Sequence, residues 1–137
     1  MNQRIAITGS SGTIGRNILN FTKIQSRLEH PFRKIQEELT HIPSLDTLLH
    51  LSSPTNLLQI EQKPVYSREL ILNGTLNLLE AFRLANGERF IYASSAHVYS
   101  PSDGKINENS KFEPISIYGE IKRECEIMLG KNAPDTE

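Results

Sequence analysis

The sequence predicts an α/β fold in which helices cover both faces of a parallel β-sheet. Short runs of apolar and β-branched residues alternate with longer segments of helical periodicity along the 137 residues. The first run stops at a Gly/Ser turn that leads directly into a helix, and the two later runs each end at a pair of serines. Alternating strands and helices are typical of a doubly wound sheet, and the length fits one domain, residues 1–137.

The first third of the chain contains one clear strand, turn and helix. Residues 4–8 form a β-branched run, residues 9–12 form the turn, and residues 14–23 have the pattern of a helix. Residues 28–44 are polar and interrupted by prolines, with a short helical stretch at 32–39. No strand is predicted in this polar segment.

The rest of the chain predicts two buried strands, each followed by a helix. The strands are residues 47–51 and 89–93, short apolar runs typical of a parallel sheet. The helix at 67–86 has the widest apolar stripe and ends at Asn86 and Gly87. A polar loop then leads into the last helix, residues 116–129.

Composition and charge exclude several classes of function. Fifteen Lys and Arg residues stand against sixteen Asp and Glu residues, so nothing in the charge favours a nucleic acid or an anionic membrane as partner. Cys125 is the single cysteine and has no disulfide partner, and no Cys/His cluster has metal-ligand spacing. No run approaches the roughly 18 apolar residues of a membrane span, and the first residues do not have the pattern of an export signal. We therefore expect a soluble, cytoplasmic protein without a metal site.

Three glycines have the spacing of a phosphate-binding loop. Gly9, Gly12 and Gly15 lie in TGSSGTIG, between the first strand and the first helix. Residues without a Cβ permit the tight turn and let backbone N–H groups approach a pyrophosphate at the positive end of the helix. The alternative is an ordinary Gly/Ser turn, because isolated spacings of this kind arise by chance.

Tyr118 and Lys122 are candidates for proton transfer. They are four residues apart in the last helix, so their side chains project from one face. A neighbouring ammonium favours the ionised phenol, so the pair suits general acid/base chemistry on an alcohol. The alternative is that the two residues simply share an exposed face.

Two serines end the strand at 89–93, where ligands collect in doubly wound sheets. A hydroxyl from Ser94 or Ser95 could donate a hydrogen bond to a reacting oxygen and stabilise developing charge. The alternative is a serine that satisfies the backbone of a turn.

Four stretches of the chain together resemble the extended short-chain dehydrogenase/reductase family, in its sugar-nucleotide epimerase and dehydratase branch. They are TGSSGTIG at 8–15, HLSS at 50–53, NGTLNLLEAF at 73–82, and RFIYASSAHVYS with PISIYGEIK between 89 and 122. The order and spacing of these stretches also match the family. The resemblance implies a Rossmann-type domain that binds NAD or NADP.

The resemblance implies a role for each matching residue. Ser95 would donate to the substrate oxygen, Tyr118 would be the acid/base, and Lys122 its partner and a ligand of the cofactor ribose. The remaining cofactor contacts would come from Gly9, Gly12, Ile14, Gly15, Leu51, Ser52, Ser53 and Tyr118. The chemistry implied is hydride transfer at a carbon of a nucleotide-linked sugar while Tyr118 moves the hydroxyl proton. Asn73 and Gly74 match the start of a helix in the family.

The sequence departs from the family in two places. The segment between Gly15 and His50 is short, and the acidic ribose ligand expected about 20 residues beyond the glycines has no clear counterpart. Glu29 lies at a tolerable distance, whereas Asp46 is expected to precede the next strand. The chain also stops soon after the Tyr/Lys helix, so we expect an abbreviated domain without the substrate domain, either as a fragment of a longer protein or as a reduced paralogue.

These departures leave other functions open. One is a non-catalytic NAD(P)-binding scaffold or sensor on the same fold, and another is a reductase of the same superfamily with a non-sugar substrate. Among the remaining polar residues, His97 lies two residues after Ser95 and could approach a substrate. Cys125 is expected to be buried, and Glu108 to be a surface carboxylate.

A homodimer is also expected, because the two helices at 67–86 and 116–129 flank the sheet and pair with their copies in this family. Their apolar residues extend beyond one stripe. The extra residues are Leu70, Leu76 and Leu84 on the first helix, and Ile117, Ile127 and Leu129 on the second. Exposed apolar residues of this kind often mark an interface, although they could instead cover the sheet edge within one chain.

Overall fold

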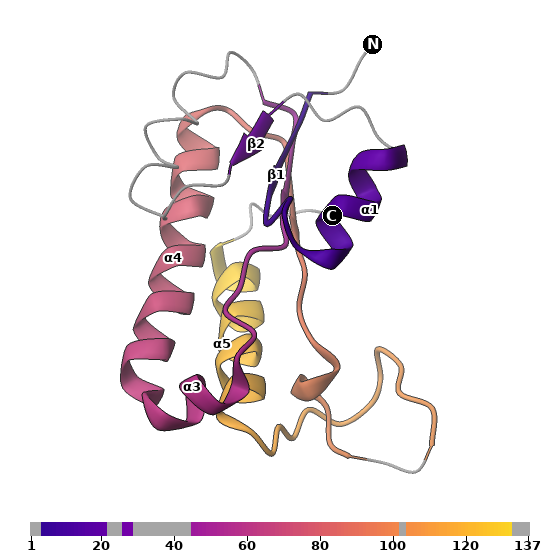
Figure 1. Ribbon diagram of the computed structural model, residues 1–137, viewed down its shortest axis with the longest axis vertical. Coiled ribbons are helices and arrows are strands. Elements are labelled where there is room, and N and C mark those ends of the chain that lie inside the picture. The colour runs from indigo at the N-terminus through magenta and orange to yellow at the C-terminus, as the bar shows by residue number, and fades with distance from the viewer. Residues whose placement is uncertain (1–3, 22–25, 29–44, 102–103, 133–137) are drawn as a thin grey trace. The chain divides into compact units, whose positions relative to one another are not determined.

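The computed structural model describes residues 4–21, 26–28, 45–101 and 104–132 (Figure 1). The chain divides into two compact units. One unit comprises residues 1–53 and 77–93, and the other comprises residues 54–76 and 94–137. The helix at 32–39 and the ribose ligand Glu29, both considered from the sequence, lie outside the described residues.

The first unit is built on a four-stranded parallel sheet in the order β2-β1-β3-β4. The strands are β1 (Ile5–Thr8), β2 (Ser26–Leu28), β3 (Thr47–His50) and β4 (Arg89–Tyr92). Ala6 faces Ser26 on one side of β1 and Leu48 on the other, and Leu48 faces Phe90. The parallel α/β fold expected from the sequence is confirmed.

Two strands differ from expectation. β2 was not predicted, because its three residues, Ser-Arg-Leu, contain no apolar or β-branched run, and the strand is defined by backbone pairing with β1. β4 was expected to be buried, yet its residues alternate between exposed and half-buried, and Ile91 is 42% exposed. The reason is that β4 is the last strand of the sheet within the described residues, so only β3 pairs with it.

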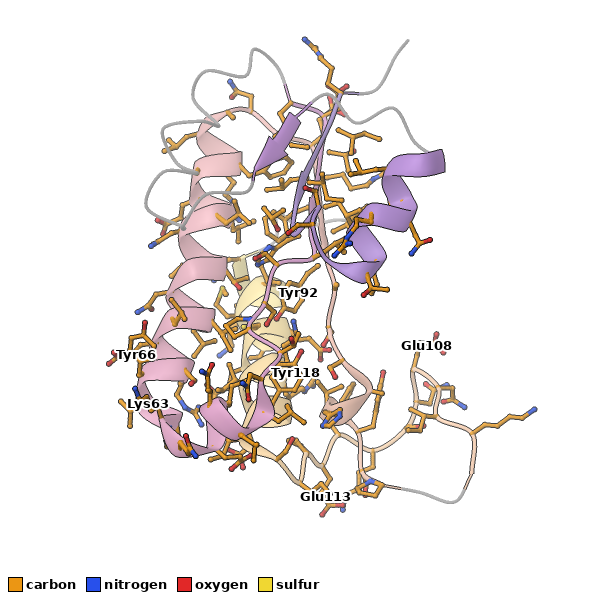
Figure 2. All side chains as sticks on the ribbon, in the orientation of Figure 1. Lys63, Tyr66, Tyr92, Glu108, Glu113 and Tyr118 are labelled. Carbon is orange, nitrogen blue, oxygen red and sulfur yellow. The ribbon has the colours of Figure 1, made fainter. Side chains whose placement is uncertain are left out.

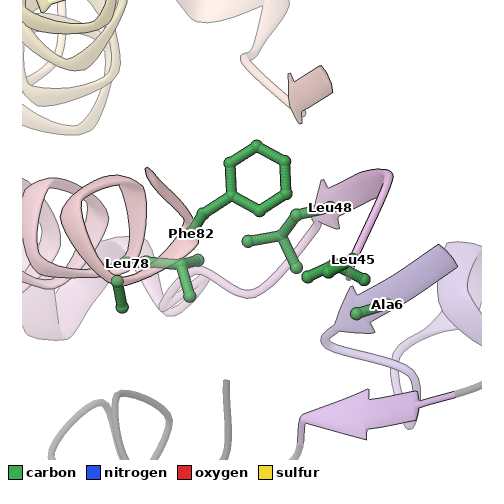
Figure 3. Close-up of a cluster of buried hydrophobic side chains, with 6 residues drawn as sticks. Ala6, Leu45, Leu48, Leu78 and Phe82 are labelled. Atoms are coloured by element: carbon green, nitrogen blue, oxygen red, sulfur yellow. The ribbon is translucent and has the colours of Figure 1, made fainter. Parts of the chain in front are cut away.

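The core of this unit lies between the sheet and the C-terminal part of α4 (Pro64–Leu84). Ala6 and Leu48 of the sheet contact Leu78 and Phe82 of the helix, with Leu45 alongside (Figure 3). The ring of Phe82 meets that of Phe90 edge to face, with centroids 5.8 Å apart. These contacts hold the parallel strands, and therefore the loops that leave their carboxyl ends.

α4 is longer than predicted and is preceded by a helix that was not predicted. It begins at Pro64, a residue whose fixed φ suits the first helical position, and it ends before Asn86, whose φ is +56°. Asn73 and Gly74 therefore lie inside the helix, and the expectation that they start it is wrong. The extra helix is α3 (Leu57–Gln62), where Asn56 Oδ1 accepts a hydrogen bond from Gln59 N at 3.2 Å. Asn56 is a residue type that commonly caps helices, so this signal was present in the sequence.

Two further helices, α1 (Thr13–Phe21) and α5 (Ile117–Asn132), agree with the sequence in type and place. The 3₁₀ turn η1 (Ala96–Val98) lies in a segment that was expected to be a loop. As expected, Cys125 is fully buried on α5, Glu108 is exposed, and Asp46 directly precedes β3. In the described part of the chain, no helix is long and apolar enough to cross a membrane, and no three His, Cys, Asp or Glu residues are grouped as metal ligands.

Candidate functional site

The loop between β1 and α1 requires glycine at two of its three glycine positions. Gly9 has a φ of +73°, and a Cβ there would lie 2.8 Å from Ser52 N. A Cβ at Gly15 would lie 2.3 Å from Gly9 O, so the start of α1 rests directly on the turn. Gly12 differs, because its Cβ would meet only Gly9 O, at 3.3 Å. Gly9 and Gly15 therefore shape the loop, while Gly12 keeps its open side free of a side chain.

The chemistry of this loop fits an anionic ligand. The first turn of α1 has no acidic residue, and Gly12 N already donates to Gly9 O at 3.1 Å, which closes the turn. Arg16 Nε donates to Ser11 O at 2.6 Å and places a guanidinium beside the loop. Ile14 is 62% exposed next to it. The residues present fit a pyrophosphate group.

A buried hydrogen-bond network links the ends of β1 and β3. Thr8 Oγ1 and His50 Nδ1 are 2.7 Å apart, and both residues are buried. Ser52 N donates to the same hydroxyl at 3.2 Å, while Leu51 N donates to Thr8 O. This network fixes the half-buried segment of Leu51, Ser52 and Ser53 against Gly9. The buried His50 therefore has a structural role, and no sequence motif considered above pointed to the link from Thr8 to Ser52.

The second unit contains the three residues considered for catalysis. Ser95 precedes η1, and its Oγ accepts a hydrogen bond from His97 N at 3.2 Å. The hydroxyl of Ser94 hydrogen-bonds the carboxylate of Glu126 on α5. Both serines therefore form local hydrogen bonds, Ser95 to the backbone of the turn and Ser94 to a side chain of α5.

Tyr118 lies near the start of α5, where Figure 2 labels it, and Lys122 follows one turn later on the same helix. Tyr118 is half-buried, whereas Lys122 is only 2% exposed. Burial lowers the pKa of Lys122 to about 8, although the acidic groups of Cys125 and Glu126 oppose this effect.

The start of α5 is held by two caps. Ser116 Oγ accepts a hydrogen bond from Gly119 N at 3.1 Å. Glu61 of α3 accepts from Ile117 N at 3.2 Å, so its carboxylate sits at the positive end of α5. Arg68 of α4 forms ion pairs with Glu120 and Glu124 on the same helix. The position of Tyr118 is thus set by contacts that the sequence motifs did not reveal.

His97 lies beside Tyr118. Its ring centroid is 5.8 Å from that of Tyr118, in an edge-to-face arrangement, and its Nδ1 is 3.4 Å from Ser116 Oγ. A Cβ at Gly119 would lie 2.3 Å from His97 O, so η1 and α5 pack closely only because residue 119 is glycine. The side chain of His97 is exposed, and its ring therefore faces both Tyr118 and solvent.

A parallel sheet with a glycine loop after its first strand, followed by a serine turn and a Tyr/Lys helix, defines a Rossmann-type α/β protein. The sequence profile of the NAD-dependent epimerase/dehydratase family matches residues 29–133. The chain therefore belongs to this family.

Relatives and solved structures agree with this assignment. A UDP-glucose 4-epimerase of Lactobacillus helveticus is 29% identical over 86 residues, which cover 62% of this chain and 26% of the relative. The structure of UDP-glucose 4-epimerase from Brucella ovis with NAD matches at a TM-score of 0.81 and 21% identity, over 94% of this chain and 47% of that one. The structure of dTDP-4-dehydrorhamnose reductase from Bacillus anthracis with NADP matches at a TM-score of 0.82 and 20% identity. This match covers 96% of this chain and 50% of that one. At these identities the structures support the fold alone, and the chain spans half or less of each of these proteins.

Proposed function

We propose that this chain is the cofactor-binding and proton-transferring part of an NAD(P)-dependent enzyme that acts on a nucleotide-linked sugar. The observation that carries the proposal is Lys122, a fully buried cation one turn from a half-buried tyrosine on a capped helix. Burying an ammonium is costly, so a position that keeps one beside Tyr118 suits a functional group. Family membership supports the same class of reaction.

Each residue has a defined task in this proposal. Tyr118 exchanges the proton of a sugar hydroxyl, and Lys122 favours the phenolate by its charge. Ser95 donates a hydrogen bond to the oxygen that gains negative charge. Bound NAD or NADP supplies hydride acceptance and donation.

Binding of the cofactor falls to the first unit. Gly9, Gly12, Ile14 and Gly15 would surround the pyrophosphate, and the backbone of residues 51–53 would run beside the cofactor. Tyr118 and Lys122 would contact the cofactor ribose. The open side of Gly12 and the absence of an acidic residue in the first turn of α1 support this assignment.

Cofactor titration tests the proposal at its first step. Calorimetry of the purified chain with NAD, NADH, NADP and NADPH should detect at least one complex, and Gly12→Glu should abolish it by filling the open side with a carboxylate. No binding of any of the four at millimolar concentration would overturn the proposal. Tyr118→Phe should retain binding but remove turnover in the longest reading frame that contains this chain.

His97 is proposed as a second proton-transferring group at the same site. Its exposed imidazole lies against Tyr118, and imidazole nitrogens can both donate and accept protons. His97→Asn should leave the affinity for the cofactor unchanged and lower turnover of the enzyme that contains the chain. Unchanged turnover over the whole pH range would assign His97 to packing alone.

Two other functions share these motifs. A non-catalytic scaffold or sensor would bind NAD(P) but would not need the Tyr118 hydroxyl. The Tyr118→Phe variant would then behave like the original chain in every cellular assay. A reductase with a non-sugar substrate would retain the dependence on Tyr118 but show no protection by UDP-sugars. The lone, buried Cys125 is consistent with a cytoplasmic location for any of the three.

A homodimer through α4 and α5 forms part of the proposal. Leu84 of α4 and Ile127 of α5 are 71% and 43% exposed, and exposed apolar residues often mark an interface. Leu76, Ile117 and Leu129 are half-buried. Leu70 is 36% exposed, but it lines a hollow between α3 and α4, so we do not include it in the interface.

A further inference from the structure

A hollow lies where α3 meets the first two turns of α4. Lys63 separates the two helices, and the hollow that they enclose has a volume of about 290 Å³. Its apolar part is formed by Pro54, Ile60 and Leu70. Its polar lining comprises Asn56, Gln59, Gln62, Lys63, Tyr66 and Ser67. None of these residues belongs to the site proposed for cofactor or sugar, and the volume is close to the lower limit of small-molecule sites, about 300 Å³.

The lining favours a negatively charged ligand. It contains one ammonium, three amides, a phenol and a hydroxyl, and no carboxylate. Within the described residues, the ammonium of Lys63 has no ion-pair or hydrogen-bond partner. Lys63 and Tyr66 are both exposed at the α3 end of α4, where Figure 2 labels them.

Ser67 gives an independent indication of a ligand. The residue is only 6% exposed and lines the hollow. Its backbone N–H donates to Lys63 O at 2.9 Å, but its hydroxyl has no hydrogen-bond partner in the described part of the chain. This hydroxyl is not fully enclosed by the protein, so it is available to donate a hydrogen bond to an oxygen acceptor in the hollow.

The start of α4 adds a positive potential. The helix is 21 residues long, and its first turn has no acidic residue to offset the positive end of its dipole. Pro64 has no N–H to donate, whereas Val65 and Tyr66 follow it with N–H groups that have no partner within the helix. Lys63, Ser67 and the N-terminus of α4 therefore all lie at the same hollow.

We propose that the α3–α4 hollow binds a phosphate group, either as free phosphate or as part of a small phosphorylated sugar. Lys63 supplies the countercharge, and Ser67 and Tyr66 donate hydrogen bonds through their hydroxyls. The side-chain amides of Asn56, Gln59 and Gln62 suit the hydroxyl groups of a sugar. The site is separate from the proposed cofactor site and does not depend on the proposed function.

Amide chemical shifts of the full chain test the proposal. Sodium phosphate, titrated against sodium chloride of equal ionic strength, should shift the backbone amides of residues 56–70 in a saturable way with a millimolar Kd. Lys63→Gln should weaken binding at least tenfold, and Ser67→Ala several-fold. Lys131→Gln, which removes an exposed lysine from the other end of α5, should leave the Kd unchanged.

Glucose 1-phosphate separates the two sources of phosphate. Tighter binding than that of inorganic phosphate assigns the hollow to a phosphorylated sugar, and equal binding assigns it to free phosphate. Shifts that grow linearly without saturation, or a Kd that Lys63→Gln does not change, would overturn the proposal. Because Lys63 is exposed and makes no contact that folding requires, its variant should keep the spectrum of a folded chain.

Discussion

Lys122 shows how one buried residue couples stability to the site. Its ammonium is enclosed by the protein, and the loss of water lowers its pKa from 10.5 to about 8. At neutral pH the folded chain therefore holds a charge whose burial is unfavourable. Such a position is tolerated when the charge serves a purpose, and proximity to Tyr118 on the same helix face supplies one.

This shift predicts that stability rises with pH in a defined window. Between pH 8 and 10.5 the unfolded chain holds the Lys122 proton while the folded chain has released it, so the free energy of unfolding increases with pH. Below pH 8 both states are protonated and the contribution is constant. The total rise is on the order of 3 kcal/mol.

Urea denaturation measured at pH 7.5 and at pH 10 would check this. Lys122→Met should lose the rise, while Lys131→Met, which removes an exposed lysine, should keep it. The three proteins differ only at residues 122 and 131, so the comparison isolates Lys122. Equal pH dependence in Lys122→Met and the original chain would contradict the burial argument.

At the scale of elements, the contact between η1 and α5 decides where Ser95 and His97 lie. The carbonyl of His97 occupies the space that a side chain at residue 119 would need, and Ser116 caps the helix beside it. Arg123 stacks over Phe112, which in turn stacks on Tyr99, just after η1. The serine turn and the tyrosine helix are therefore parts of one packed assembly.

Gly119→Ala should disrupt this assembly. The new Cβ would lie 2.3 Å from His97 O, and the backbone would have to move, at a cost of about 1–3 kcal/mol in stability. Gly130→Ala is the matched control, because it lies on the same helix with no atom within 4 Å of its Cβ. The control should be stabilised by up to about 1 kcal/mol, since alanine is the better helix former. Thermal unfolding measures the change in stability of each variant. Equal changes would show that the close approach of η1 to α5 does not require glycine at residue 119.

The sequence predicted those elements whose residues carry their own signal. The glycine turn, the three apolar strands and the amphipathic helices follow from local composition, and the structure contains them. β2 could not be found, because its strand state depends on pairing with β1 and not on its residues. The same holds for the site: Tyr118 and Lys122 were recognisable from their spacing, whereas Glu61 acts through an α3–α5 contact across 56 residues. Contacts of that kind depend on tertiary structure, which local patterns do not encode.

At the scale of the whole molecule, the chain carries two units and half or less of the length of the relatives described above. The first unit holds the glycine loop, and the second holds the Ser95, Tyr118 and Lys122 set. Helices α4 and α5 carry the exposed apolar residues Leu84 and Ile127.

The last prediction is that the chain forms a homodimer through these helices. Ile127 is 43% exposed on α5, and Leu84 is 71% exposed at the end of α4, so two apolar positions on the helices face solvent in a single chain. A symmetric dimer is the commonest way to bury such residues. Sedimentation at micromolar concentration should give twice the mass of the chain. Ile127→Lys should give the monomer mass without unfolding, because the residue is already partly exposed.

Ile106→Lys is the matched control, because Ile106 is equally exposed but lies in the loop before α5. This control should remain dimeric. Leu76→Lys should also dissociate the dimer, although Leu76 is half-buried and its variant must be checked for folding. A monomer in the original chain, or equal behaviour of the Ile127 and Ile106 variants, would contradict an interface on α5. The exposed residues would then be left as isolated apolar positions, which single chains commonly tolerate.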